Sequence, residues 1–178
     1  MNNRKSVLKL AISALCLALA YVLPFVTGQI PKLGQMLLTM HIPVLLCGFI
    51  CGWGWGLGVG LIAPILRSLN LGAPVLFPTA ICMALELAAY GAGTGIFYKI
   101  LPKRKRFIYV SLALSMICGR IVWGIAMAIC LGLSGDAFTF NAFIAGAIIN
   151  ALPGILIQLI LIPILVISLE RLRIYERL

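Results

Sequence analysis

Long apolar stretches alternate with short polar segments along the whole chain. Six stretches stand out, at about residues 7–26, 36–51, 56–69, 77–99, 107–133 and 142–169. A helix rises about 1.5 Å per residue, so about 20 apolar residues cross the roughly 30 Å hydrocarbon core of a bilayer. The pattern therefore predicts an all-α integral membrane protein, a bundle of six transmembrane helices that forms a single membrane domain over residues 1–178.

The amino-acid composition excludes an ordinary soluble fold. Of the 178 residues, 63% are hydrophobic and only 10% are charged, whereas soluble domains are roughly half apolar and one quarter charged. We therefore expect a multi-pass protein of the cell membrane.

Basic residues cluster at a few places between the apolar stretches, and this clustering predicts the orientation. Eleven of the fourteen Lys and Arg residues lie at the N-terminus, around the junction of the fourth and fifth stretches, or after the sixth: Arg4, Lys5, Lys9, Lys99, Lys103, Arg104, Lys105, Arg106, Arg171, Arg173 and Arg177. Lys32 falls on the opposite side, and Arg67 and Arg120 lie within stretches. Because Lys and Arg are retained in short cytoplasmic loops, both termini are predicted to be cytoplasmic. The net charge of +10 then reflects topology, and no nucleic-acid partner is expected.

The sequence carries no motif of a stand-alone catalyst. It has no phosphate-binding loop, no nucleophile elbow and no zinc-protease motif, so we expect no enzyme activity, no catalytic residue and no cofactor. Six cysteines lie within or beside the apolar stretches without metal-ligand spacing: Cys16, Cys47, Cys51, Cys82, Cys118 and Cys130. We expect buried thiols there, and neither a metal site nor disulfides. Energy for uphill transport would have to come from a partner or from ion coupling.

Two ionisable residues lie deep within apolar stretches. Glu86 and Arg120 are each about 13 residues from the basic segment that joins the fourth and fifth stretches, which places both about 20 Å from the cytoplasmic surface. Charged groups at such depth are costly and usually face the bundle interior or a wet cavity. Three interpretations stay open: a buried ion pair that joins two helices, a ligand site in which Arg120 donates to a carboxylate or carbonyl, or part of a proton relay.

Further polar and aromatic residues fall toward the expected outer half of the bundle. His41, Arg67 and Asn150 are the most informative, because an amide or an ionisable group among apolar residues needs a partner. A ligand pocket combines a few such groups with apolar and aromatic walls. For His41, a structural role near the membrane interface is as well supported by the sequence as contact with a ligand. The candidate substrate-binding residues are Glu86, Arg120, Trp123, Asn150, His41, Arg67 and Tyr90.

Small residues at helical spacing mark faces on which helices approach closely. Ala14 and Ala18 form such a face in the first stretch, and Gly91 and Gly95 form one in the fourth. We expect the glycines to pack inside the bundle, whereas the alanine face is a candidate for contact with another subunit.

Several of these features occur together, in order, in one known family. They are Ala14-x-x-x-Ala18, the segment Met40-His41-Ile42-Pro43-Val44 with Gly48, the turn Gly52-Trp53-Gly54-Trp55-Gly56, and Phe77-Pro78-Thr79-Ala80 leading into Glu86. Over nearly its whole length the chain resembles the substrate-binding S components of energy-coupling factor (ECF) transporters, which import vitamins into bacteria.

The resemblance implies both a substrate and partners. It implies a water-soluble vitamin bound near the outer surface, and docking through Ala14 and Ala18 to a membrane coupling subunit that carries two ATPase subunits. Pantothenate is the first candidate substrate, because the chain resembles the pantothenate-type branch of the family and because Arg67 or Arg120 could meet its carboxylate. Pyridoxine, hydroxymethylpyrimidine, folate and cobalamin precursors stay open. The alternatives are a stand-alone ion-coupled transporter and a membrane assembly protein without transport activity.

Overall fold

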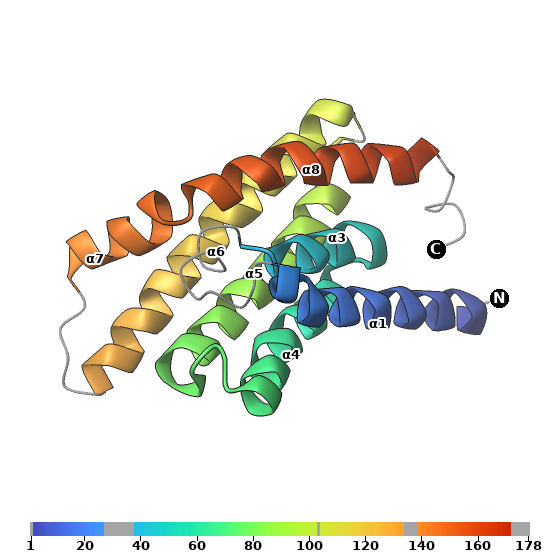
Figure 1. Ribbon diagram of the computed structural model, residues 1–178. Helices are drawn as coiled ribbons and strands as arrows, with labels where there is room; N and C mark the ends of the chain where they lie inside the picture. Colours follow the sequence, from blue (N-terminus) through green and yellow to red (C-terminus); the bar gives the residue numbers. More distant parts are fainter. Residues whose placement is uncertain (1, 27–37, 103, 134–138, 172–178) are drawn as a thin grey trace.

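The computed structural model describes residues 2–26, 38–102, 104–133 and 139–171, which are helical apart from short connections. The helices are α1 (Asn2–Val26), α3 (His41–Cys51), α4 (Trp53–Leu71), α5 (Ile81–Ile100), α6 (Lys105–Leu133), α7 (Phe140–Ile144) and α8 (Leu152–Arg171). Two five-residue segments complete them, η1 (Leu76–Ala80), which is kinked at Phe77, before α5, and η2 (Ala145–Ile149) between α7 and α8. Figure 1 shows these helices packed as one bundle, and the described part of the chain confirms the predicted all-α fold class.

Helix α5 lies at the centre of the bundle and packs against α3, α4 and α6. In the most apolar 18-residue part of Leu76–Ile100, 56% of the residues are buried, whereas the corresponding share in Asn3–Phe25 of α1 is 17%. Glycines make this close packing possible, because a Cβ atom on Gly91 would overlap the backbone of Gly56 in α4, and one on Gly95 would overlap the backbone of Trp53. The internal packing role predicted for these two glycines of α5 is therefore confirmed.

Four helical spans are long and apolar enough to cross a bilayer: Asn3–Phe25, Leu76–Ile100, Lys105–Leu133 and Leu152–Arg171. Helix α3 is shorter, with 11 residues, and spans only about 16 Å. Its first residue, His41, is fully buried. A helix that begins partway through the bundle brings its N-terminal side chains to the depth at which the long helices carry their buried polar groups.

Three sequence predictions are wrong in detail. The glycine- and tryptophan-rich segment 52–56 is not a turn: Gly52, with φ 98°, alone separates α3 from α4, and Trp53 already begins α4. The stretch 142–169 is not one helix, since it is divided among α7, η2 and α8. Pro153 lies in the first turn of α8, where proline starts a helix readily. Cys118 is exposed, whereas the other five cysteines are buried as expected.

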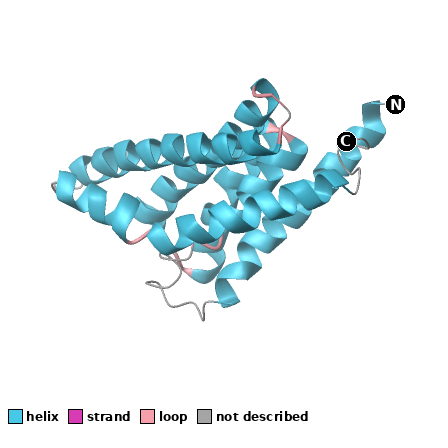
Figure 2. Ribbon diagram, turned by 90° about the horizontal axis from the view of Figure 1, so that it is seen from above, coloured by secondary structure: helices cyan, strands magenta, loops and turns pink. Residues whose placement is uncertain are grey.

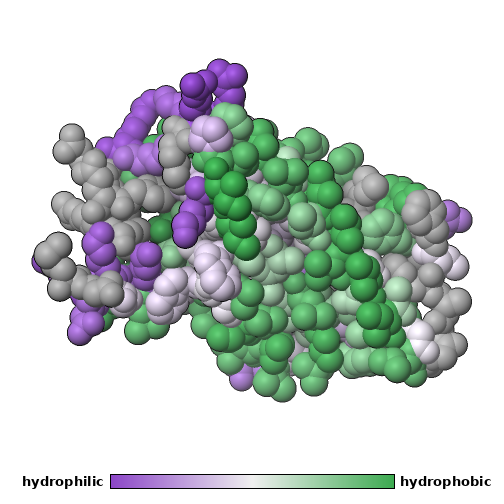
Figure 3. All heavy atoms as spheres, turned by 180° about the vertical axis from the view of Figure 1, so that it is seen from behind, coloured by the Kyte–Doolittle hydropathy of each residue, from purple (hydrophilic) through white to green (hydrophobic). Residues whose placement is uncertain are grey.

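The hydropathy of the surface follows the membrane pattern. Figure 2 shows the start of α1, the end of α8 and the connection between α5 and α6 toward the same end of the molecule. Figure 3 shows a broad hydrophobic band, with hydrophilic residues gathered mainly toward that end. This arrangement agrees with both termini on one side of a membrane; that this side is cytoplasmic stays a prediction.

Candidate substrate-binding site

Glu86 and Arg120 meet as an ion pair between the two central long helices. Nη1 of Arg120 in α6 lies 2.8 Å from Oε1 of Glu86 in α5, and the two side chains are 13% and 2% exposed. Their contact confirms the matched depth that the sequence predicts. A lone charge at such burial would be very costly, and in this pair each side chain compensates the charge of the other.

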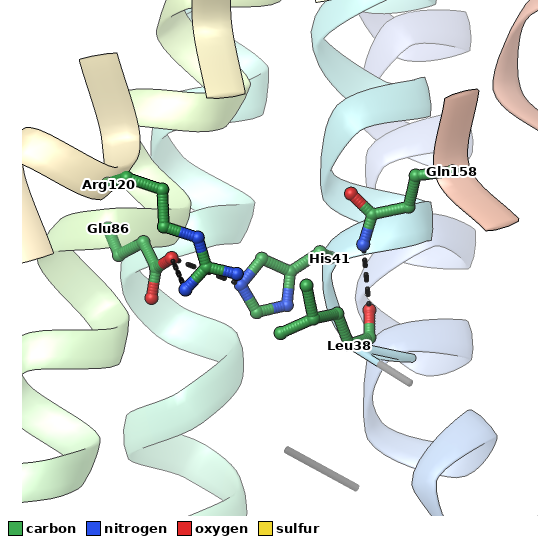
Figure 4. Close-up of polar contacts among 5 residues, drawn as sticks. All are labelled: Leu38, His41, Glu86, Arg120 and Gln158. Atoms are coloured by element: carbon green, nitrogen blue, oxygen red, sulfur yellow. Dashed lines mark hydrogen bonds and ion pairs between the residues drawn. The ribbon is translucent and has the colours of Figure 1, made fainter. Parts of the chain in front are cut away.

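His41 and Tyr90 extend this cluster toward α3. Nε2 of His41 lies 3.6 Å from the same Glu86 oxygen, which is too long for a hydrogen bond but within reach of an ion pair if the imidazole is protonated. The His41 ring meets the Tyr90 ring edge to face, with 5.2 Å between centroids. Tyr90 follows Glu86 by one helical turn on α5. Its buried hydroxyl interacts with the charges of Glu86 and Arg120 but forms no hydrogen bond of normal geometry with either. Three helices therefore contribute to one buried polar cluster, part of which is drawn in Figure 4.

Gln158 of α8 fixes the backbone from which His41 projects. Its Nε2 group donates to the backbone oxygen of Leu38 at 3.3 Å (Figure 4). The backbone N–H of His41 donates to the same oxygen at 3.0 Å. Leu38 has a φ of 51°, a conformation that costs a residue with a side chain some energy. Sequence reasoning did not assign Gln158 to the site, although an amide in the apolar stretch of α8 was a signal that it needs a partner.

The cluster is rich in buried polar atoms that form no hydrogen bond within the described part of the chain. They are Nδ1 and Nε2 of His41, the Tyr90 hydroxyl, Nε and Nη2 of Arg120, and Oε1 of Gln158. Native interiors leave few such atoms, and each costs about 1–3 kcal/mol if nothing binds it. Their concentration at one place supplies donors and acceptors for a small polar molecule.

Arg67 does not join this cluster. Its Nη1 donates to the backbone oxygen of Tyr21 in α1 at 2.7 Å, and its guanidinium lies 5.0 Å from the centre of the Phe25 ring. The side chain therefore binds α4 to the last turns of α1, where carbonyl groups and the helix dipole favour a cation.

Two further candidates occupy other positions. Trp123 stacks on Phe143 of α7, with 6.3 Å between ring centroids, and a Cβ atom on Gly146 of η2 would press against its ring. Asn150 is exposed in the turn between η2 and α8, and its backbone N–H donates to Ala145. The prediction that Asn150 sits as an amide inside a continuous helix is wrong, because the helix is interrupted there.

Ala14 and Ala18 lie on an exposed face of α1. They line a shallow groove of about 350 Å³ that also includes Leu66 and Asn70 of α4. The alanine face is therefore accessible and is not used for packing inside the bundle.

Comparison with known proteins identifies the family. The chain matches the family described as ECF transporter, substrate-specific component, over residues 8–166, and it belongs to that family. No curated protein and no solved structure gives a match to the chain.

Proposed function

Because the chain belongs to the substrate-specific components of ECF transporters, we propose that it is the high-affinity binding subunit of an importer for a water-soluble vitamin or related micronutrient. The observation that carries this proposal is the buried cluster of His41, Glu86, Tyr90 and Arg120 with its unpartnered polar atoms. Its role is to bind and deliver a molecule, and we propose no catalytic step.

The alternative role of the cluster is a purely structural link between α5 and α6. A structural ion pair is expected to complete its own hydrogen bonds, because incomplete buried networks destabilise a fold. Here one nitrogen of Arg120 contacts Glu86, while its Nε and Nη2 have no partner in the described residues. A ligand that accepts from these two N–H groups accounts for the open side of the guanidinium.

Pantothenate is our first candidate for the substrate. The Nε and Nη2 groups of Arg120 form the parallel pair of donors that binds a carboxylate through two hydrogen bonds. Pantothenate also carries hydroxyl and amide groups, which match the open Tyr90 hydroxyl and the open Gln158 carbonyl. We do not propose Arg67 as the group that binds the carboxylate, because its guanidinium already contacts the Tyr21 backbone oxygen and the Phe25 ring.

A ligand screen on the purified, solitary protein tests the proposal. The panel consists of pantothenate, nicotinate and biotin, each paired with an uncharged analogue (panthenol, nicotinamide and biotin amide), together with pyridoxine, hydroxymethylpyrimidine, folate and cobalamin precursors. At a concentration of 100 times Kd, a specific ligand stabilises the protein by about 2.7 kcal/mol, which is a clear rise in Tm. If no member raises Tm, the proposed function is contradicted.

We further propose that the Ala14 and Ala18 face docks to a membrane coupling subunit that carries two ATPase subunits. Its support is the exposure of both alanines at a spacing that allows close helix contact. The double substitution Ala14→Leu with Ala18→Leu should abolish co-purification with these partners and uptake, while ligand binding by the solitary protein stays normal. Ala128→Leu, at an exposed alanine of α6, is the matched control and should leave both intact.

A further inference from the structure

The charges of the buried cluster impose a condition on any ligand that carries a carboxylate. Glu86 and Arg120 form a pair with 2.8 Å between their charged atoms and no net charge. A carboxylate on the open side of Arg120 adds one negative charge to a region where His41 and Glu86 are each 2% exposed. Unbalanced charge at such burial is strongly unfavourable. A further positive charge is therefore needed when the ligand binds.

His41 can supply that charge. Its Nε2 lies 3.6 Å from Oε1 of Glu86, and neither ring nitrogen has a hydrogen-bond partner in the described chain. Histidine is the side chain that commonly gains a proton between pH 5 and 8. With both ring nitrogens protonated, the charges alternate in the order His41, Glu86, Arg120 and ligand, as positive, negative, positive and negative.

We propose that this site binds a carboxylate ligand together with one proton, which comes from the solution and is held by the imidazole of His41. The inference rests on the proposed function and adds two properties to it: the substrate is a carboxylic acid in its ionised form, and its binding is linked to pH. Arg120 receives the carboxylate, Glu86 lies between the two cations, and His41 balances the charge.

The charged and polar groups around His41 determine how strongly its imidazole would hold this proton. Glu86 and Tyr90 face it from α5, and Arg120 approaches the same Glu86 oxygen from α6. Gln158 of α8 is uncharged and fixes Leu38 beside it. On α4 the buried cation is Arg67, which is bound to Tyr21 of α1. Without ligand, the charges of Glu86 and Arg120 balance each other; a carboxylate on Arg120 would add a second negative charge to the cluster, and the proposed imidazolium of His41 would balance it.

The direction of the pH dependence follows from this linkage. If the complex holds one more proton than the free protein and free ligand, raising the pH opposes binding. Where His41 is neutral in the free protein, the affinity for the carboxylate should fall by up to about tenfold for each pH unit. An uncharged analogue needs no compensating proton, so its affinity should not change with pH.

Calorimetric titration of the full-length protein measures the proton directly. Pantothenate is titrated at pH 7.5 in two buffers with different ionisation enthalpies, and panthenol, which has a hydroxymethyl group instead of the carboxylate, serves as the matched ligand. We expect uptake of about one proton per pantothenate bound and none with panthenol. His41→Gln, which cannot be protonated, should abolish the uptake and leave a weaker affinity that no longer varies between pH 6 and 8.

The outcomes separate this inference from the proposed function. If pantothenate, nicotinate or biotin binds without proton uptake, or if His41→Gln takes up the same proton, the inference is overturned. If an uncharged member of the panel binds in preference to every acid, the inference is also overturned while the proposed function stands. Failure of every ligand to bind contradicts the proposed function itself.

Discussion

Two arginines within the helices of this protein face different surroundings. Arg67 is 4% exposed and is occupied by the Tyr21 backbone oxygen and the Phe25 ring. Arg120 binds Glu86 through Nη1, while its Nε and Nη2 point to no partner within the described residues. The first arginine joins two helices, and the second joins two helices and also presents unused donors to the interior.

This difference shows how a structural charge can be distinguished from a ligand-binding one. Both residues are arginines inside apolar stretches, so the cost of burying their charge does not separate them. What separates them is that Arg120 has two fully buried N–H groups, Nε and Nη2, without a hydrogen-bond partner in the described residues, whereas no such atom is found on Arg67. The cluster residues His41 and Tyr90, and Gln158 beside Leu38, also have buried polar atoms without a hydrogen-bond partner in the described residues. A bound molecule could supply the missing partners.

The largest expected effect comes from breaking the buried pair. Either Glu86→Gln or Arg120→Met leaves its partner charged and uncompensated, and each should lower the free energy of unfolding by about 3–5 kcal/mol. The double variant should return close to the wild-type value, because it removes both charges. Thermal unfolding in detergent measures all four proteins. Additive losses would show that the two residues do not act as a pair.

A smaller effect is expected at Arg67. Arg67→Met removes a charged hydrogen bond and a contact with an aromatic ring, and should lower the free energy of unfolding by about 2–3 kcal/mol. The affinity of the folded protein for its ligand should not change, as titration of the variant below its Tm will show. Arg67→Lys, which keeps a cation able to donate to Tyr21, should recover part of the stability. A loss of affinity in both variants would place Arg67 in the site.

The smallest effect on stability is expected at Tyr90. Tyr90→Phe removes a buried hydroxyl that has no hydrogen-bond partner in the described residues, so stability should change by less than about 1 kcal/mol, while affinity should fall about tenfold through one lost hydrogen bond to ligand. Tyr98→Phe is the matched control: Tyr98 lies on the same helix but donates to Glu170, so this change should lower stability and leave affinity unaltered. Equal affinities of Tyr90→Phe and wild type would remove Tyr90 from the site.

The sequence predicts the helical fold and the matched depth of Glu86 and Arg120 because both follow from regular spacing. Glu86 and Arg120 are equally far from the segment that joins their helices, and a constant rise per residue places them at one depth. The partner of Arg67 has no such signature, because it is a backbone oxygen that any residue at position 21 would offer. The contact between Gln158 and Leu38 depends on where α8 begins after the interruption, which helical spacing alone does not define.

The central claim is that the cluster around Glu86 and Arg120 binds the ligand. Ligand binding by the double variant tests it most directly, because this variant separates the effect on stability from the effect on ligand recognition. Combining Glu86→Gln with Arg120→Met should restore the wild-type Tm, yet it removes the two donors proposed for the carboxylate. We predict that the ligand identified in the panel raises the Tm of the wild type and leaves the Tm of the double variant unchanged. A double variant that is stable and still binds this ligand with wild-type affinity would show that the cluster only joins helices.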